Sequence, residues 1–145
     1  DDSVEIPVRF TKTETMSVKA FFAVTEAKDG SIVDCSNVES VTRVIPKTQA
    51  VAEAAIKELL KGPIGNEASG EVIQTSIPVG TVLQKIEIKN STAYVDFNKA
   101  LDFQVGGSCR VTAIRSQIEQ TLKQFPTIKN VIISIDGRTE DILQP

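Results

Sequence analysis

Two segments of this sequence have the apolar periodicity of a helix that buries a single stripe. In residues 49–61 apolar side chains recur every three or four positions, Glu and Lys occupy the opposite face, and Gly62-Pro63 ends the pattern. In residues 108–125 the same periodicity continues until Pro126. Because a helix with one apolar stripe must bury it against another element, the two segments predict helices packed on a sheet.

Strand patterns occupy most of the remaining sequence. The expected strands are 17–25, 41–45, 83–89, 92–97 and 131–135. Asn90-Ser91 joins the third and fourth of these as a hairpin. The last strand, VIISI, is apolar at nearly every position, which favours a central place in the sheet with both faces covered. Residues 64–80 are interpreted as a long excursion with room for one irregular strand.

The predicted order of elements is therefore ββαββαβ, and the predicted fold class is α+β. We expect a two-layer sandwich in which one mixed β-sheet is covered by two amphipathic helices. No internal repeat or linker interrupts residues 17–145, so we expect a single domain there. Residues 1–16 are polar and have no periodicity, and we interpret them as a linker.

Charge and composition exclude several classes of function. The chain of 145 residues has a net charge of −3 and no basic run, so nucleic acid is not an expected partner. No apolar stretch is long enough for a membrane span. The sequence contains no His, which removes the usual general base, the Ser-His and Cys-His nucleophile pairs and the commonest zinc ligand.

The two cysteines leave three interpretations open. Cys109 lies in the first turn of the second predicted helix, where the helix dipole and the adjacent Arg110 favour a reactive thiolate. Cys35 and Cys109 could instead form a disulfide in an exported protein, or both could be buried thiols. Catalysis is disfavoured because a thiol nucleophile needs a proton acceptor, and the chain has no His.

Acidic residues offer a weaker signal for chemistry. Pairs such as Asp96 with Asp102, or the cluster of Asp136, Glu140 and Asp141, could hydrolyse glycosides or bind calcium. Their positions are those of an outward-facing strand residue and an Asp-Gly turn, which are ordinary structural roles. We therefore expect no catalytic residue, no metal and no cofactor.

Three arginines form a candidate polar cluster with two acids. Arg43 lies in a predicted strand, and Arg110 and Arg115 lie on the second predicted helix. They could converge on a partner or a carboxylate. Local pairing with acids such as Asp34 or Asp96 is the favoured interpretation.

Three longer segments resemble the GerMN domain, the sporulation and spore-germination module of bacterial cell-surface lipoproteins. These segments are 34–63, 77–101 and 106–145, and they contain DCS, VTR-x-IP, LLKGP, VDF and GGSCR. The resemblance implies a non-enzymatic, extracytoplasmic α/β domain with an αββαβ core similar to the ring-building motif. It also implies that Cys35 and Cys109 match the family's cysteine pair and form a disulfide. It supplies no catalytic residue.

The expected function is that of a structural or protein-interaction module of a membrane-anchored bacterial envelope protein, linked to sporulation, germination or envelope regulation. Envelope proteins or copies of the chain are the expected partners, through a sheet edge or the helices, although we expect a monomer in isolation. The alternative is a module that binds cell-wall glycan or peptide. Glycan binding is disfavoured because the chain has no Trp and one Tyr. An enzyme that uses Cys109 or paired acids ranks last.

Overall fold

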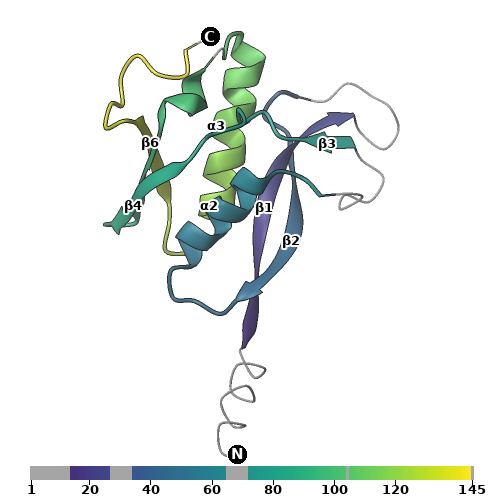
Figure 1. The fold of residues 1–145 in the computed structure, drawn as a ribbon, viewed down its shortest axis with the longest axis vertical. Coiled ribbons are helices and arrows are strands. Elements are labelled where there is room, and N and C mark those ends of the chain that lie inside the picture. Colours follow the sequence, from purple (N-terminus) through teal and green to yellow (C-terminus); the bar gives the residue numbers. More distant parts are fainter. Residues whose placement is uncertain (1–13, 27–33, 65–71, 104, 145) are drawn as a thin grey trace, which may run out of the picture.

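The computed structural model describes residues 14–26, 34–64, 72–103 and 105–144 (Figure 1). In chain order the elements are β1 (Thr15–Glu26), β2 (Val38–Pro46), α2 (Val51–Lys61), β3 (Val72–Gln74), β4 (Leu83–Lys89), β5 (Thr92–Phe97), the 3-10 helix η2 (Lys99–Asp102), α3 (Ser108–Lys123) and β6 (Asn130–Ile135). Residues 1–13 of the expected linker lie outside the described residues. The expected excursion at 64–80 contains the short strand β3, and its residues 65–71 also lie outside.

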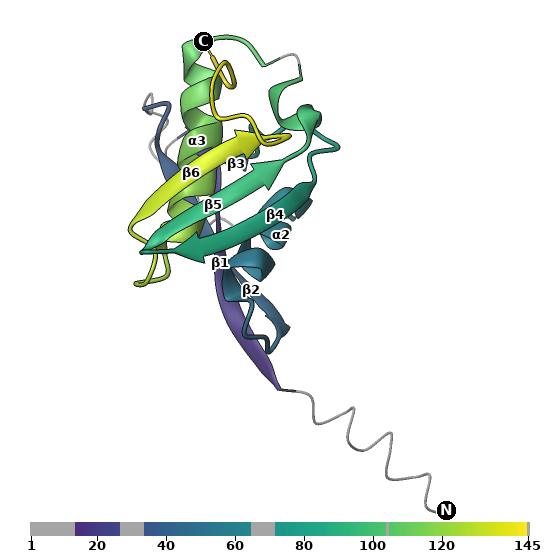
Figure 2. The same ribbon diagram turned by 90° about the vertical axis from the view of Figure 1, so that its left-hand side faces the viewer.

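The strands form two three-stranded sheets, whereas the sequence analysis expected one mixed sheet. β1 is the centre of an antiparallel sheet in the order β2-β1-β3. β5 is the centre of a mixed sheet in the order β4-β5-β6. The helices α2 and α3 contact each other and lie between the two sheets (Figures 1 and 2). The α+β class with two helices is confirmed, but the helices are covered by a sheet on each side.

The core contains the faces that periodicity predicted. β1 buries every second residue from Val18 to Val24, and β5 buries Ala93, Val95 and Phe97. The apolar stripe of α3 contributes the buried residues Val111, Ile114, Ile118 and Leu122. The predicted hairpin is present, and Asn90 and Ser91 both have positive φ, as a two-residue turn between twisted strands requires. Within the described residues, neither α-helix is long and apolar enough to cross a membrane.

The last strand is at an edge of its sheet, so its predicted central position was wrong. β6 pairs with β5 in parallel and has no strand on its other side within the described residues (Figure 2). Ile133 and Ile135 face the core, but Ile132 points outward and is 40% exposed. The prediction failed because an apolar run carries no information on how many strands flank it, and here it does not imply that both faces are covered either, since the outer face is open at Ile132. From α2 onward the order is αββαβ with β3 added, and the similarity to the ring-building motif stays a prediction.

A second face of α3, which is polar, explains why the helix is covered on both sides. Gln117 and Thr121 are fully buried although they lie outside the apolar stripe. Thr121 Oγ1 accepts a hydrogen bond from the N–H of Phe21 at 3.0 Å. The side-chain amide of Gln124 accepts a hydrogen bond from the N–H of Lys19 at 2.9 Å and donates one to the carbonyl of Lys19 at 2.7 Å. These side chains satisfy the edge of β1 that β3 leaves unpaired, and they dock α3 on the first sheet.

The variant Thr121→Val should therefore be less stable by about 1–2 kcal/mol, because it leaves the N–H of Phe21 without an acceptor while keeping the side-chain volume. Urea denaturation measures this difference. Thr112→Val is the matched control, since Thr112 is exposed on the same helix. Equal stability of both variants would show that the bond to β1 contributes nothing.

Candidate functional site

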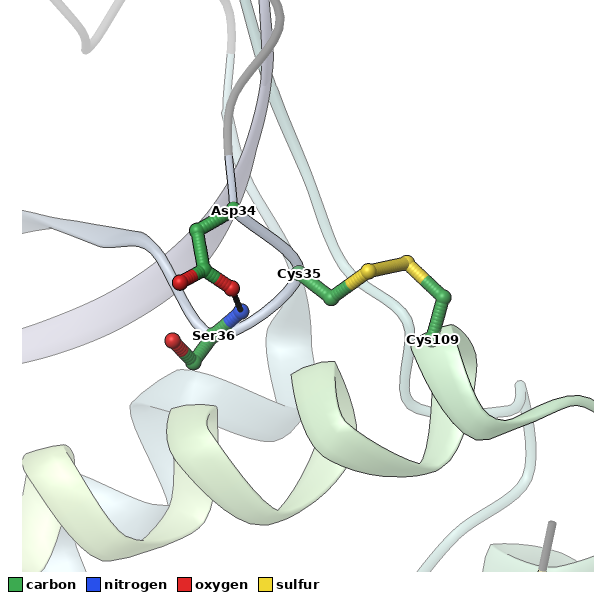
Figure 3. The surroundings of a disulfide bond; sticks show 4 residues. All are labelled: Asp34, Cys35, Ser36 and Cys109. Atoms are coloured by element: carbon green, nitrogen blue, oxygen red, sulfur yellow. Dashed lines mark hydrogen bonds between the residues drawn. A yellow bond between two sulfur atoms is a disulfide. The ribbon is translucent and has the colours of Figure 1, made fainter.

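A disulfide between Cys35 and Cys109 marks the candidate site. The S–S distance is 2.02 Å and the Cα atoms are 5.2 Å apart. Figure 3 shows that the bond joins the turn before β2 to the first turn of α3. The pairing implied by the GerMN resemblance is thus present, and neither sulfur is available as a free thiol.

The turn that carries Cys35 is held by its own hydrogen bonds and by a second contact with α3. Asp34 Oδ1 accepts from the N–H of Ser36 at 3.1 Å (Figure 3). The Asp34 carbonyl accepts from the N–H of Asn37 at 2.9 Å. Ser116 Oγ on α3 donates to the carbonyl of Ser36 at 2.7 Å. An Asp side chain that accepts from the backbone two residues later is common in tight turns. The turn therefore presents the disulfide in a defined position.

A hollow of about 530 Å³ lies beside the disulfide. Its lining includes both cysteines, Ala23 and Val24 of β1, Ala113 of α3, and the polar residues Asp34, Gln74, Thr75, Ser76 and Arg110. Arg110 Nε donates to the carbonyl of Ser76 at 3.2 Å, and Gln117 Oε1 accepts from the N–H of Ser76 at 2.8 Å. The hollow thus combines an apolar surface with charged groups of both signs, which is an arrangement that can bind a ligand with apolar and charged parts.

The five candidate polar residues lie in separate places. Asp34 and Arg110 line the hollow. Asp96 is the penultimate residue of β5, where its carboxylate accepts from Ser134 Oγ at 2.5 Å and from the N–H of Gly137 at 2.8 Å. Arg115 donates to the carbonyl of Ile142 at 3.5 Å. These positions leave two of the five candidates at the hollow, and their role in binding remains a prediction.

Arg43 is buried between β2 and α2, away from the hollow, with 7% of its surface exposed. It lies on the core-facing side of its strand and donates to the carbonyl of Gly62 at 2.8 Å and to the carbonyl of Glu58 at 3.2 Å. Arg43 is also paired with the carboxylate of Glu58 at 3.4 Å, whereas the sequence favoured pairing with acids such as Asp34 or Asp96. Arg43 therefore joins β2 to the end of α2.

Gln74, Thr75 and Ser76 are the polar lining residues that no sequence pattern had indicated. They end or follow β3, in the segment that has no helical or strand periodicity. The run of three polar residues before Ile77 was the available signal, and a run this short does not distinguish a binding surface from an ordinary loop. In the described part of the chain, no group of three or more Cys, Asp or Glu side chains is placed to hold a metal ion.

Comparisons with known proteins agree with this fold. The model of the Germane family, described as sporulation and spore germination, matches residues 20–141. No curated protein matches the chain.

Solved structures show the same fold at low sequence identity. The tandem GerMN domains of the sporulation protein GerM from Bacillus subtilis align over 90% of this chain and 43% of theirs, with 20% identity and a TM-score of 0.61. The first GerMN domain of that protein aligns over 84% of this chain and 85% of its own, with 23% identity and a TM-score of 0.58. A candidate lipoprotein from Clostridium perfringens aligns over 89% of this chain and 80% of its own, with 19% identity and a TM-score of 0.56. This chain therefore spans less than half of the tandem structure.

Proposed function

Because this chain belongs to the Germane family of sporulation and spore germination, we propose that it is a non-enzymatic, extracytoplasmic interaction module of a bacterial envelope protein. The observation that carries the proposal is the Cys35–Cys109 disulfide. Disulfides persist in oxidising compartments and are rare in the cytosol, which supports a place outside the cytoplasmic membrane. The similar candidate lipoprotein from Clostridium perfringens supports attachment to the membrane.

The chemistry of the chain supports binding more than catalysis. The disulfide removes both thiols, and the sequence has no His to activate a hydroxyl group. The hollow beside the disulfide offers a docking surface instead, since it has an apolar lining and a charge of each sign, Asp34 and Arg110. We infer that another envelope protein docks there.

Site-specific photo-cross-linking in the native cell tests this proposal. A photoreactive residue is placed at Gln74, which is exposed and lines the hollow, and for comparison at Thr42, which is exposed on β2. We expect one defined envelope protein to be cross-linked from Gln74 and not from Thr42. Cross-links that are absent at Gln74, or that are the same at both positions, would contradict docking at the hollow.

Binding of cell-wall peptide is the second candidate, because opposite charges on the hollow suit a ligand that carries both an amine and a carboxylate. Sedimentation with purified cell wall distinguishes it from protein docking. Cell-wall binding that is lost in Arg110→Glu would favour the peptide, whereas a chain that stays in the supernatant would exclude it.

A further inference from the structure

The free edge of β6 lacks the features that usually protect a strand edge. The sequence of β6, NVIISI, has no charged residue and no Pro, and its register with β5 is regular. The opposite edge of the same sheet, β4, carries Lys85, Glu87 and Lys89 and has a register shift between Leu83 and Lys85. Proteins block unwanted pairing with such charges and irregularities. β4 is therefore protected and β6 is not.

Hydrogen bonds show which backbone groups of β6 are open. The N–H of Asn130 donates to Ser91 and that of Asp136 donates to Phe97, so the even-numbered residues of β6 bond toward β5. Odd-numbered residues point away from β5. The backbone groups of Ile135 are not open, because its N–H donates to the carbonyl of Arg138 at 2.9 Å and its carbonyl accepts from the N–H of Arg138 at 3.0 Å.

Val131 and Ile133 are the two remaining odd-numbered residues of β6. Their N–H and C=O groups have no hydrogen-bond partner within the part of the chain that the structure describes. The comparable edge of β1 is closed by Thr121 and Gln124 of α3. Among the described residues, side chains of α3 thus close the edge of β1, whereas four backbone groups at the edge of β6 have no partner.

We propose that β6 pairs with β6 of a second copy of this chain, antiparallel, about a two-fold axis at Ile132. In this register Val131 of each copy lies opposite Ile133 of the other. The N–H and C=O groups of both residues, four in each strand, are then hydrogen-bonded to the partner strand. An axis at Val131 would leave some of these groups unpaired. An axis at Ile133 would place Val131 opposite Ile135, whose backbone groups are already bonded to Arg138. The edge is therefore complementary to itself.

Side chains on the outer face favour the same pairing. Ile132 and its register partner Tyr94 are 40% and 42% exposed, and they lie side by side on the outer face of the sheet. The two-fold axis places Ile132 of each copy next to its equivalent, which covers part of this apolar pair. Because β6 has no charge, the two strands approach without repulsion. The dimer would form one continuous six-stranded sheet.

The test is the mass of the protein in solution as a function of concentration. We expect light scattering to show a rise from 15.7 kDa toward twice that mass, in place of the monomer expected from the sequence. Ile132→Lys should weaken association by about tenfold, because like charges then face each other across the axis. Ile88→Lys is the matched control, since Ile88 is a 46% exposed isoleucine on the protected edge strand β4, and it should dimerise as the wild type does.

Hydrogen exchange separates this dimer from other modes of association. The amides of Val131 and Ile133 should exchange more slowly as the protein concentration rises. In Ile132→Lys the same slowing should need an about tenfold higher concentration, while circular dichroism confirms that the variant is folded. A protein that stays monomeric at high concentration would overturn the proposal, as would a dimer whose Val131 and Ile133 amides exchange at an unchanged rate. Protection of these amides only by another envelope protein would also overturn it. The dimer does not depend on the hollow, so the cross-links from Gln74 can fail or succeed independently.

Discussion

Replacing both cysteines, as in Cys35→Ser/Cys109→Ser, is expected to lower the free energy of unfolding by about 4 kcal/mol. The bond joins residues 74 positions apart, so it removes a large amount of conformational freedom from the unfolded chain. Serine is tolerated in the folded state because Cys109 is exposed and Cys35 is half-buried. Urea denaturation at equal protein concentration gives the difference, and the m-value reports whether the unfolded chain has also expanded.

Two measurements make the interpretation of this loss unambiguous. The intact mass after alkylation under denaturing conditions should show no modified thiol before reduction and two after it, which confirms that the native protein carries the bond. The wild type in reducing agent should then match the double variant. If the variant is as stable as the oxidised wild type, the disulfide does not stabilise the domain. Its role would then be confined to the position of the turn beside the hollow.

Ser116 limits how far the turn can move when the disulfide is absent. Its hydroxyl group still donates to the carbonyl of Ser36 at 2.7 Å, and the backbone bond from Asn37 to Asp34 keeps the turn closed. The double variant should therefore keep the fold at low temperature and lose stability mainly through its unfolded state. A chain that needed the bond in order to fold would instead show the circular dichroism spectrum of an unfolded protein without denaturant.

The sequence predicted the individual elements well because each of them buries a face with its own period. Val18 to Val24 and Val111 to Leu122 show this, since the residues that the patterns assigned to the core are buried. The division into two sheets could not be predicted in the same way. Periodicity reports a buried face, but the partner that covers it depends on residues distant in the sequence. The polar contacts of Thr121 and Gln124 hold α3 on β1, and neither residue contributes to an apolar pattern.

The candidate site was predictable only in part for a related reason. The cysteine pair was implied by the resemblance of DCS and GGSCR to the family motifs, because a motif carries information about residues that meet in space. Thr75 and Ser76 line the hollow because of the path of the loop that follows β3. A single sequence contains no pattern that predicts such a path. Arg43 shows the limit of charge as a guide. A charged residue within a strand suggested a surface partner, but this one is buried and bonds to main-chain carbonyls.

Replacement of Arg43 should have the second large effect on stability. Arg43→Met is expected to cost about 3 kcal/mol, because it removes a buried guanidinium and leaves the carbonyls of Gly62 and Glu58 without their donor. The same variant loses the contact of the guanidinium with the ring of Phe22, whose centroid is 5.6 Å away. It also removes a positive charge from the end of α2, where the helix dipole favours one. Thermal and urea unfolding measure the loss.

Two further variants separate the ion pair from the bonds to the main chain. Glu58→Gln removes the carboxylate, which is bonded to Lys61 at 2.7 Å as well as to Arg43, but it keeps both carbonyl acceptors. It leaves the buried guanidinium without its carboxylate partner, although the Gln amide oxygen can still accept from it, and it should cost about 1.5 kcal/mol. Arg43→Lys keeps the charge but cannot reach two acceptors at once with a planar fork, and it should cost about 2 kcal/mol. If Glu58→Gln cost as much as Arg43→Met, the charge pair would be the main contribution. If Arg43→Met and Arg43→Lys instead both cost more than Glu58→Gln, Arg43 would stabilise the domain chiefly through its bonds to the main chain, which close the end of α2 against β2.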